Sequence, residues 1–238
     1  MWRWIKVSVL IGVVAGSCWM PQAQATFFSL PRQLKGQVAL LSFDLPSLSP
    51  MAFTRFCVQY PDECRAPKLT FRPRKLELTP ERWADLVTVT RDVNRAIIPE
   101  RNLRGILAEE WLLSPKAGDC NDYAVTKRHE LMARGWPSRA LVLTEVEVPS
   151  GEHHLVLVAR TDAGDFVLDN LVSAVRPVSR TPYRWVRAQS PRNPKFWSVV
   201  HVTRATRAAS ARSARMRSAD ASTLVLSDSD PEGGGQYN

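Results

Sequence analysis

The feature that most constrains the fold is a helix-like segment followed directly by strand-like runs in the second half of the chain. A helix is expected over residues 120–134, because Gly135 and then Pro137 follow it as stop signals. The strand-like runs cover residues 139–148, 153–161 and 165–171. The last two flank a turn-rich insertion and suit an antiparallel hairpin. A helix followed by antiparallel strands predicts an α+β fold.

Cys120 stands at the start of the expected helix, in the segment Gly-Asp-Cys-Asn-Asp-Tyr-Ala. The helix amides place partial positive charge near its sulfur, and a neighbouring imidazolium could pair with a thiolate. Such surroundings lower the pKa of a thiol from about 8.5 into the range of about 3.5–7.5. We therefore expect Cys120 to be ionised at neutral pH and to react with iodoacetamide well below pH ~8.

The two hairpin strands carry residues that could activate this thiol. Strand alternation and the position of the turn place His154 and Asp169 within about one or two pairings of each other. A nucleophile, a base and a carboxylate that orients the base form the arrangement of thiol hydrolases. Cys120, His154 and Asp169 are therefore the predicted catalytic residues. His153, on the opposite face, and Asn170 are competitors for the last two positions.

Other interpretations of these residues stay open at this stage. A lone cysteine is often inert packing in a core. Cys120, either histidine and Asp169 could also bind zinc, although a second close-spaced pair of ligands is lacking. Trp111 could line a substrate groove or, more simply, pack in the core.

The N-terminal 25 residues have the pattern of a cleavable export signal. Arg3 and Lys6 precede an apolar stretch over residues 7–19, and Ala23-Gln24-Ala25 forms a small-x-small cleavage site. A retained anchor and lipid attachment at Cys18 are the less favoured alternatives. The pattern predicts a periplasmic or secreted protein.

Export changes how the remaining cysteines are interpreted. Cys57 and Cys64 flank a turn-forming proline, Pro61, and predict a disulfide in an oxidising compartment. So short a loop should be stabilised by about 2–3 kcal/mol. Cys120 is then left as an unpaired thiol in an exported protein, and catalysis would explain why it is there.

The rest of the chain suggests one domain over residues 26–203, with an accessory helical part over about 50–115 and a catalytic core over about 116–203. Thr79, Pro80 and Glu81 begin a confident helix that ends before Pro99. Residues 204–238 contain few large apolar side chains and are expected to be disordered. The formal charge of +9 indicates chiefly a solvated basic surface, with attraction to acidic surfaces or wall polymers as the alternative. No nucleic-acid motif is present, so nucleic acid is not an expected partner.

The Gly-Asp-Cys-x-Asp-Tyr-Ala segment, His154 and the Gly-Asp-Phe-Val-Leu-Asp-Asn segment ending at Asn170 resemble the bacterial transglutaminase-like cysteine peptidases. The resemblance covers about residues 50–202. It implies a papain/transglutaminase-like fold and the same three catalytic residues. It also implies a calcium site at Asp119 and Asp122, although Asn121 stands where calcium-binding members commonly have Glu. Family members include periplasmic proteases that release surface adhesins under the control of an inner-membrane receptor.

These observations predict an exported cysteine peptidase that hydrolyses protein amide bonds. It requires no cofactor, with calcium as an optional ligand. Acyl transfer to an amine and hydrolysis of wall peptides are alternatives within the enzyme class. A non-catalytic binding module with the same fold is the alternative outside it.

Overall fold

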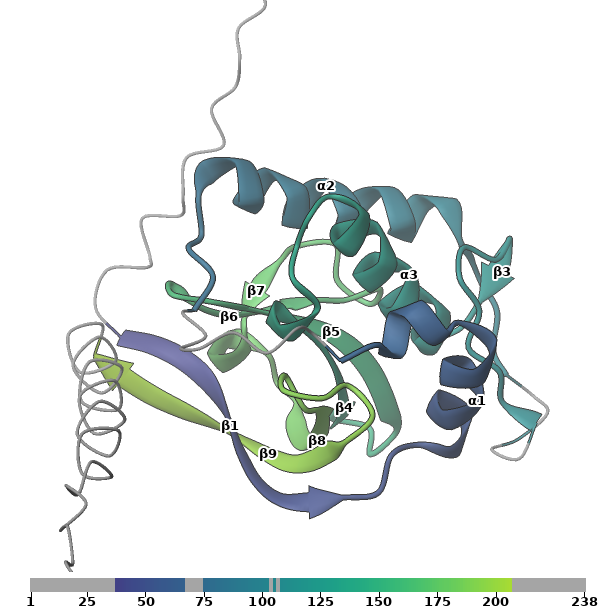
Figure 1. Cartoon of the computed structure of the whole chain (residues 1–238). Coiled ribbons are helices and arrows are strands. Elements are labelled where there is room, and N and C mark those ends of the chain that lie inside the picture. The colour runs from purple at the N-terminus through teal and green to yellow at the C-terminus, as the bar shows by residue number, and fades with distance from the viewer. Residues whose placement is uncertain (1–36, 67–74, 103–104, 106–107, 207–238) are drawn as a thin grey trace, which may run out of the picture.

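The computed structural model describes residues 37–66, 75–102, 105 and 108–206. The expected export signal and residues 207–238 of the expected tail lie outside these residues. The predicted start of the disordered tail at residue 204 is wrong, because residues 204–206 continue a strand that pairs with the first strand of the sheet. Figure 1 shows the described chain as a curled sheet with helices α2 and α3 against one of its faces. No helix in this part of the chain has the length and apolar character needed to cross a membrane.

The helices and strands follow one another along the chain in this order: β1 (Gln37–Ser47), α1 (Met51–Gln59), η2 (Pro61–Cys64), α2 (Pro80–Ala96), β2 (Ile98–Pro99), β3 (Ala117–Gly118), α3 (Cys120–Ala133), η4 (Ser138–Ala140), β4 (Leu141–Glu147), β5 (His153–Thr161), β6 (Gly164–Leu168), β7 (Arg176–Pro177), η5 (Val178–Arg180), β8 (Arg184–Gln189) and β9 (Trp197–Thr206). The main sheet has the strand order β1-β9-β8-β4-β5-β6-β7. Every pairing within it is antiparallel, while β2 and β3 pair in parallel. The predicted α+β class is confirmed.

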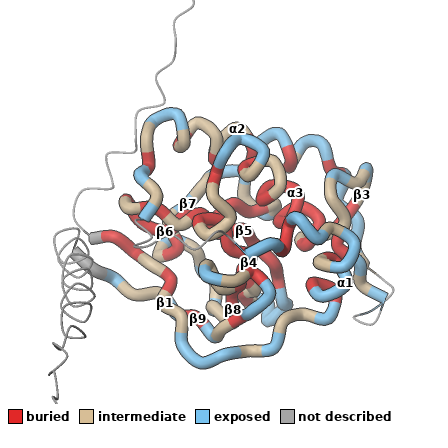
Figure 2. Tube along the Cα trace, viewed as in Figure 1, coloured by how far each residue is buried: buried red, intermediate tan, exposed pale blue. Residues whose placement is uncertain are grey.

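Helix α2 begins and ends where the sequence signals indicate. The side chain of Thr79 caps it by accepting a hydrogen bond from the backbone N–H of Arg82 at 3.3 Å, and Pro80 is its first residue. Its apolar stripe, including Trp83 and Leu86, packs into the core. Helix α3 lies beneath it and contacts both α2 and β5. Figure 2 shows α3 largely buried, whereas much of the outer side of α2 is exposed.

The alternation along β5 divides the core between the two faces of the sheet. Leu155 and Leu157 pack toward the helices, and Val156 and Val158 pack inside the curl of the sheet. The curl brings β1 next to β6, where the buried carboxylate of Asp165 accepts the backbone N–H of Leu41 at 2.8 Å.

The predicted disulfide between Cys57 and Cys64 is present and joins α1 to η2, with a Cα–Cα distance of 5.4 Å. The adjacent Glu63 is buried and pairs with two residues of α3. Its carboxylate lies 2.8 Å from Nη1 of Arg128 and 2.6 Å from Nδ1 of His129. The disulfide segment is thereby fastened to the helix that begins with Cys120.

Candidate active site

The start of α3 is built by a reciprocal cap. Asp119 accepts the backbone N–H of Asn121 at 3.0 Å, and Asp122 accepts the backbone N–H of Asp119 at 3.0 Å. Gly118 is required by this arrangement, because a Cβ added there would lie 2.2 Å from Oδ2 of Asp122. The Gly-Asp-Cys sequence therefore fixes the position of Cys120 as the first residue of the helix.

His154 and Asp169 meet as the hairpin register predicted. Nε2 of His154 lies 2.9 Å from Oδ1 of Asp169, and both side chains are buried. His153 points the other way, is exposed, and pairs with Glu145 at 2.6 Å. The geometry thus favours His154 over His153 as the candidate base. The side chain that contacts its imidazole is that of Asp169, which favours Asp169 over Asn170 as the orienting residue.

Tyr183 is a member of this cluster that the sequence did not reveal. Its hydroxyl donates to Oδ2 of Asp169, and its ring lies edge-on to His154 with centroids 6.1 Å apart. Burial alone would raise the pKa of Asp169, but hydrogen bonds from His154 and Tyr183 reverse this, so the pKa is lowered. Burial and the contact with Asp169 raise the pKa of Tyr183, which keeps its hydroxyl as a donor.

Cys120 lies against the strand that carries His154. The backbone N–H of Leu155, the next residue in β5, is directed at the Cys120 thiol. The charge of His154 also acts on Asp119, directly before the cysteine. Helix α3 and strand β5 thus bring the predicted nucleophile and the predicted base into one region.

The expectation that Cys120 is ionised at neutral pH is wrong for this structure. Burial raises the pKa of its thiol to about 12, and the nearby charges of Asp119 and Glu109 add to the effect. The Leu155 N–H opposes this shift but does not overcome it. The prediction took account of the helix start and the imidazole, both of which lower the pKa of a thiol. It did not take account of the burial and the surrounding acids, which raise the pKa of Cys120 by more.

These acids form a cluster beside the thiol. Burial raises the pKa of Asp122 to about 6, and the charges of Asp119 and Glu109 contribute. Glu109 accepts the indole N–H of Trp111 at 3.1 Å and the side-chain amide of Asn121. Trp111 itself is buried in the core. Glu109 was not predicted as a neighbour of Cys120, because no sequence spacing links it to Asp119.

The predicted calcium ligands Asp119 and Asp122 both serve as caps of α3. Within the described ranges, no three His, Cys, Asp or Glu side chains come together as a metal-binding group, which also gives no support to the zinc interpretation. Two carboxylates that repel each other are suitable hard ligands for calcium, and backbone oxygens and water would have to complete the shell. The residues thus fit a weak calcium site.

Lys127 is a buried cation on the same helix. Its side chain is almost fully buried, and its Nζ lies 5.4 Å from the centroid of the Tyr123 ring. Burial lowers its pKa to about 7, and the charge of Asp169 partly opposes that shift. The sequence pattern gave no sign of this placement, because lysine is expected on exposed helix faces.

The model of the bacterial transglutaminase-like cysteine proteinases matches residues 45–205. Calcium-bound LapG of Legionella pneumophila is similar at 24% identity and a TM-score of 0.41, over 44% of this chain and 64% of that one. LapG in another solved structure gives 26% identity and a TM-score of 0.39, over 44% and 62%.

The chain therefore spans less than two thirds of the length of these solved relatives. No curated protein is significantly similar to it. The family match covers residues 45–205, which is well over half of the 238 residues. The chain belongs to the bacterial transglutaminase-like cysteine proteinase family.

Proposed function

We propose that the protein is an exported cysteine peptidase that hydrolyses amide bonds in protein substrates. Cys120 is the nucleophile, His154 the general base and Asp169 the residue that orients the base. The main support is the buried hydrogen bond of 2.9 Å between His154 and Asp169, beside the strand segment whose backbone faces the Cys120 thiol. Family membership agrees with this assignment.

The contact with Asp169 supports Nδ1 of His154 as the nitrogen that acts as the base. Because the Asp169 carboxylate accepts from Nε2, the proton of neutral His154 resides there, and Nδ1 is left as the base. Since burial keeps the Cys120 thiol protonated, the proton moves to Nδ1 as the sulfur attacks the carbonyl carbon. The imidazolium then protonates the leaving amine, and water hydrolyses the resulting thioester. The Cys120 backbone N–H is the expected donor to the oxyanion.

Calcium is proposed as a ligand of the acids beside the thiol. Asp119 and Asp122 would hold it, and its charge would favour their ionised forms against the burial that raises both pKa values. Calcium-bound LapG gives a precedent in the family. Calcium should raise the melting temperature of the wild type but not that of Asp119→Asn, with magnesium as the control cation. If calcium raised the melting temperature of both proteins equally, these acids would not be its ligands.

The compartment, the substrate and the regulator are proposed from the sequence. The signal-like N-terminus supports a location in the periplasm or outside the cell. A surface adhesin as substrate and an inner-membrane receptor as regulator follow from the family resemblance alone. Hydrolysis is favoured over acyl transfer because water is the abundant acceptor there. The binding module and the wall-peptide hydrolase are separated from the peptidase by the experiment below.

The proposal is tested by profiling newly formed N-termini in surface and periplasmic proteins incubated with the purified wild type or with Cys120→Ala. Cleavage by the wild type that is lost in the variant is expected. Equal cleavage by both proteins, or no protein cleavage by the wild type, would overturn it. Release of wall peptides or formation of isopeptide crosslinks would identify the alternative enzyme reactions.

A further inference from the structure

A cationic pocket lies in the curl of the sheet, away from the candidate active site. It has a volume of about 520 Å³ and is lined by residues of β1, η4, β5, β6, β9 and the adjoining loops. Arg160 in its wall follows His154 by six positions on β5, which corresponds to about 20 Å along the strand. The proposed catalytic reaction therefore does not use this pocket.

The charges in the pocket wall are strongly unbalanced. Four of the lining residues are cations and one is an acid: Lys75, Arg139, Arg160, Arg192 and Asp165. One carboxylate cannot balance four cations, and the Asp165 carboxylate is buried, where it accepts the Leu41 backbone N–H at 2.8 Å. The pocket thus presents an excess of positive charge.

Arg160 is fixed in place with hydrogen-bonding capacity unused. Its guanidinium lies 4.8 Å from the centroid of the Phe43 ring, and its Nε lies 3.7 Å from Oδ2 of Asp165. Nε is buried and makes no hydrogen bond within the described residues. The terminal guanidinium nitrogens of Arg160 also make no hydrogen bond within the described residues, so they could donate to an anionic ligand while Nε stays paired with Asp165.

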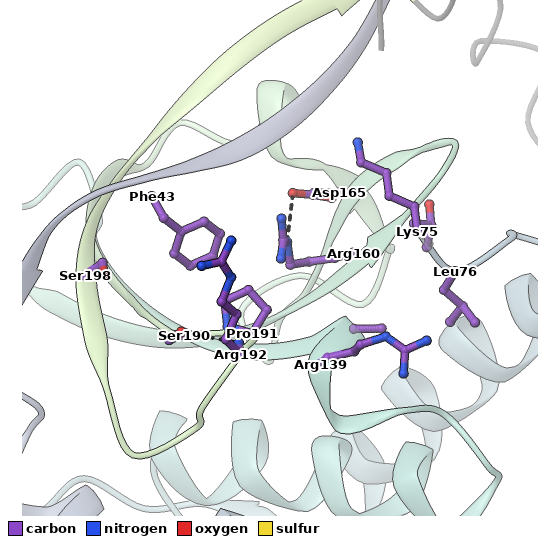
Figure 3. Close-up of a pocket in the computed structure, with 12 residues that line it drawn as sticks. Phe43, Lys75, Leu76, Arg139, Arg160, Asp165, Ser190, Pro191, Arg192 and Ser198 are labelled. Atoms are coloured by element: carbon purple, nitrogen blue, oxygen red, sulfur yellow. Dashed lines mark hydrogen bonds and ion pairs between the residues drawn. The ribbon is translucent and has the colours of Figure 1, made fainter. Parts of the chain in front are cut away.

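Two further arginines have free guanidinium groups. Among the described residues, neither the side chain of Arg139 nor that of Arg192 makes a hydrogen bond or ion pair. Figure 3 shows Phe43, Pro191 and Arg192 on one side of Arg160, and Leu76 and Arg139 on the other. The planar fork of arginine suits phosphate and carboxylate groups, and the apolar side chains could contact an organic body.

We propose that this pocket binds a small organic anion that combines a phosphate or carboxylate group with an apolar part. Its volume of about 520 Å³ lies within the range of small-molecule sites. The proposal does not depend on the proposed peptidase function, because binding is measured without a substrate.

Isothermal titration calorimetry with phenyl phosphate, benzoate and phenol tests the proposal on the purified full chain. Saturable binding of at least one of the two anions is expected, with phenol much weaker. The double variant Arg139→Gln/Arg192→Gln should bind that anion at least about tenfold more weakly. Arg95→Gln removes one exposed charge from α2 and should bind as the wild type does.

Binding by phenyl phosphate alone would identify a phosphate site, and binding by benzoate alone a carboxylate site. Inorganic phosphate should compete with phenyl phosphate in the wild type, which provides a measurement independent of any variant's folding. Absence of saturable binding by both anions, equal binding of phenol, or equal affinity of the double variant and Arg95→Gln would overturn the proposal. Circular dichroism checks the fold of each variant.

Discussion

Nε2 of His154 lies 2.9 Å from Oδ1 of Asp169 inside the protein, and Asp169 is further held by the hydroxyl of Tyr183. The backbone N–H of Leu171 donates to the same carboxylate at 3.0 Å. A carboxylate with three donors is held in one orientation and kept ionised despite its burial. The imidazole therefore has a fixed orientation even before a substrate arrives.

Tyr183→Phe should lower the free energy of unfolding by about 1.5–3 kcal/mol at neutral pH, because a buried charged acceptor loses a donor. The pKa of Asp169 is lowered below its ordinary 3.8 in the folded state. Its contribution to stability is therefore present above pH 3.8 and lost as the pH falls through the lowered value. Urea unfolding against pH should show the deficit of the variant shrinking in acid.

Tyr60→Phe is the matched control for that variant, because the hydroxyl of Tyr60 contacts only the exposed Gln59 side chain among the described residues. It should change stability little at any pH. If the two variants were equally stable, the Tyr183 hydroxyl would not stabilise the Asp169 carboxylate.

Asp119→Asn should lower the pKa of the Cys120 thiol. Asparagine caps a helix about as well as aspartate, so the start of α3 is kept while one negative charge near the sulfur is removed. The rate of alkylation by iodoacetamide should rise at a lower pH in the variant than in the wild type. Asp92→Asn removes an exposed charge from α2 and should leave the profile unchanged. Superimposable profiles for Asp119→Asn and the wild type would contradict the role given to this acid.

Lys127→Met should raise the free energy of unfolding, because the buried ammonium is costly. The folded pKa of about 7 lies below the ordinary 10.5, so the folded state binds fewer protons than the unfolded state between these values. The contribution of Lys127 to the free energy of unfolding of the wild type therefore increases as the pH rises between these two pKa values. The gain in the variant should be largest below pH 7, at most about 5 kcal/mol, and should shrink toward pH 10.5.

Urea titrations at several pH values measure this gain, with the exposed Lys116→Met as the comparison. A loss of stability in Lys127→Met at every pH would mean that the ammonium stabilises the fold through Asp169 or the Tyr123 ring.

Removing the disulfide with Cys57→Ala/Cys64→Ala should cost about 2–3 kcal/mol of stability, since the closed loop is short. A reductant should weaken the wild type by a similar amount and leave the double variant unaffected. If the double variant also responds to the reductant, the effect does not come from this bond.

Local signals predicted much of the fold. The Thr79 cap and Pro80 placed α2, Gly135 ended α3, and alternation placed His154 on its strand. The spacing of Cys57 and Cys64 predicted their bond. Each of these features depends on residues close together in sequence, where conformational preferences act directly.

The features that were missed depend on contacts between distant segments. Tyr183 reaches Asp169 through the packing of the loop before β8, and Glu109 approaches Cys120 from a loop before the helix. Helix α1 has no side-chain cap that would mark its start. The raised pKa of Cys120 follows from burial and from these neighbouring charges, neither of which a motif displays.

The central claim is that His154 takes the proton from Cys120. Intact-protein mass spectrometry can follow iodoacetamide alkylation of Cys120 at neutral pH in the wild type and in His154→Ala. We predict faster modification of the wild type, because the variant retains a buried thiol of high pKa without a base. Equal rates in the two proteins would contradict the account.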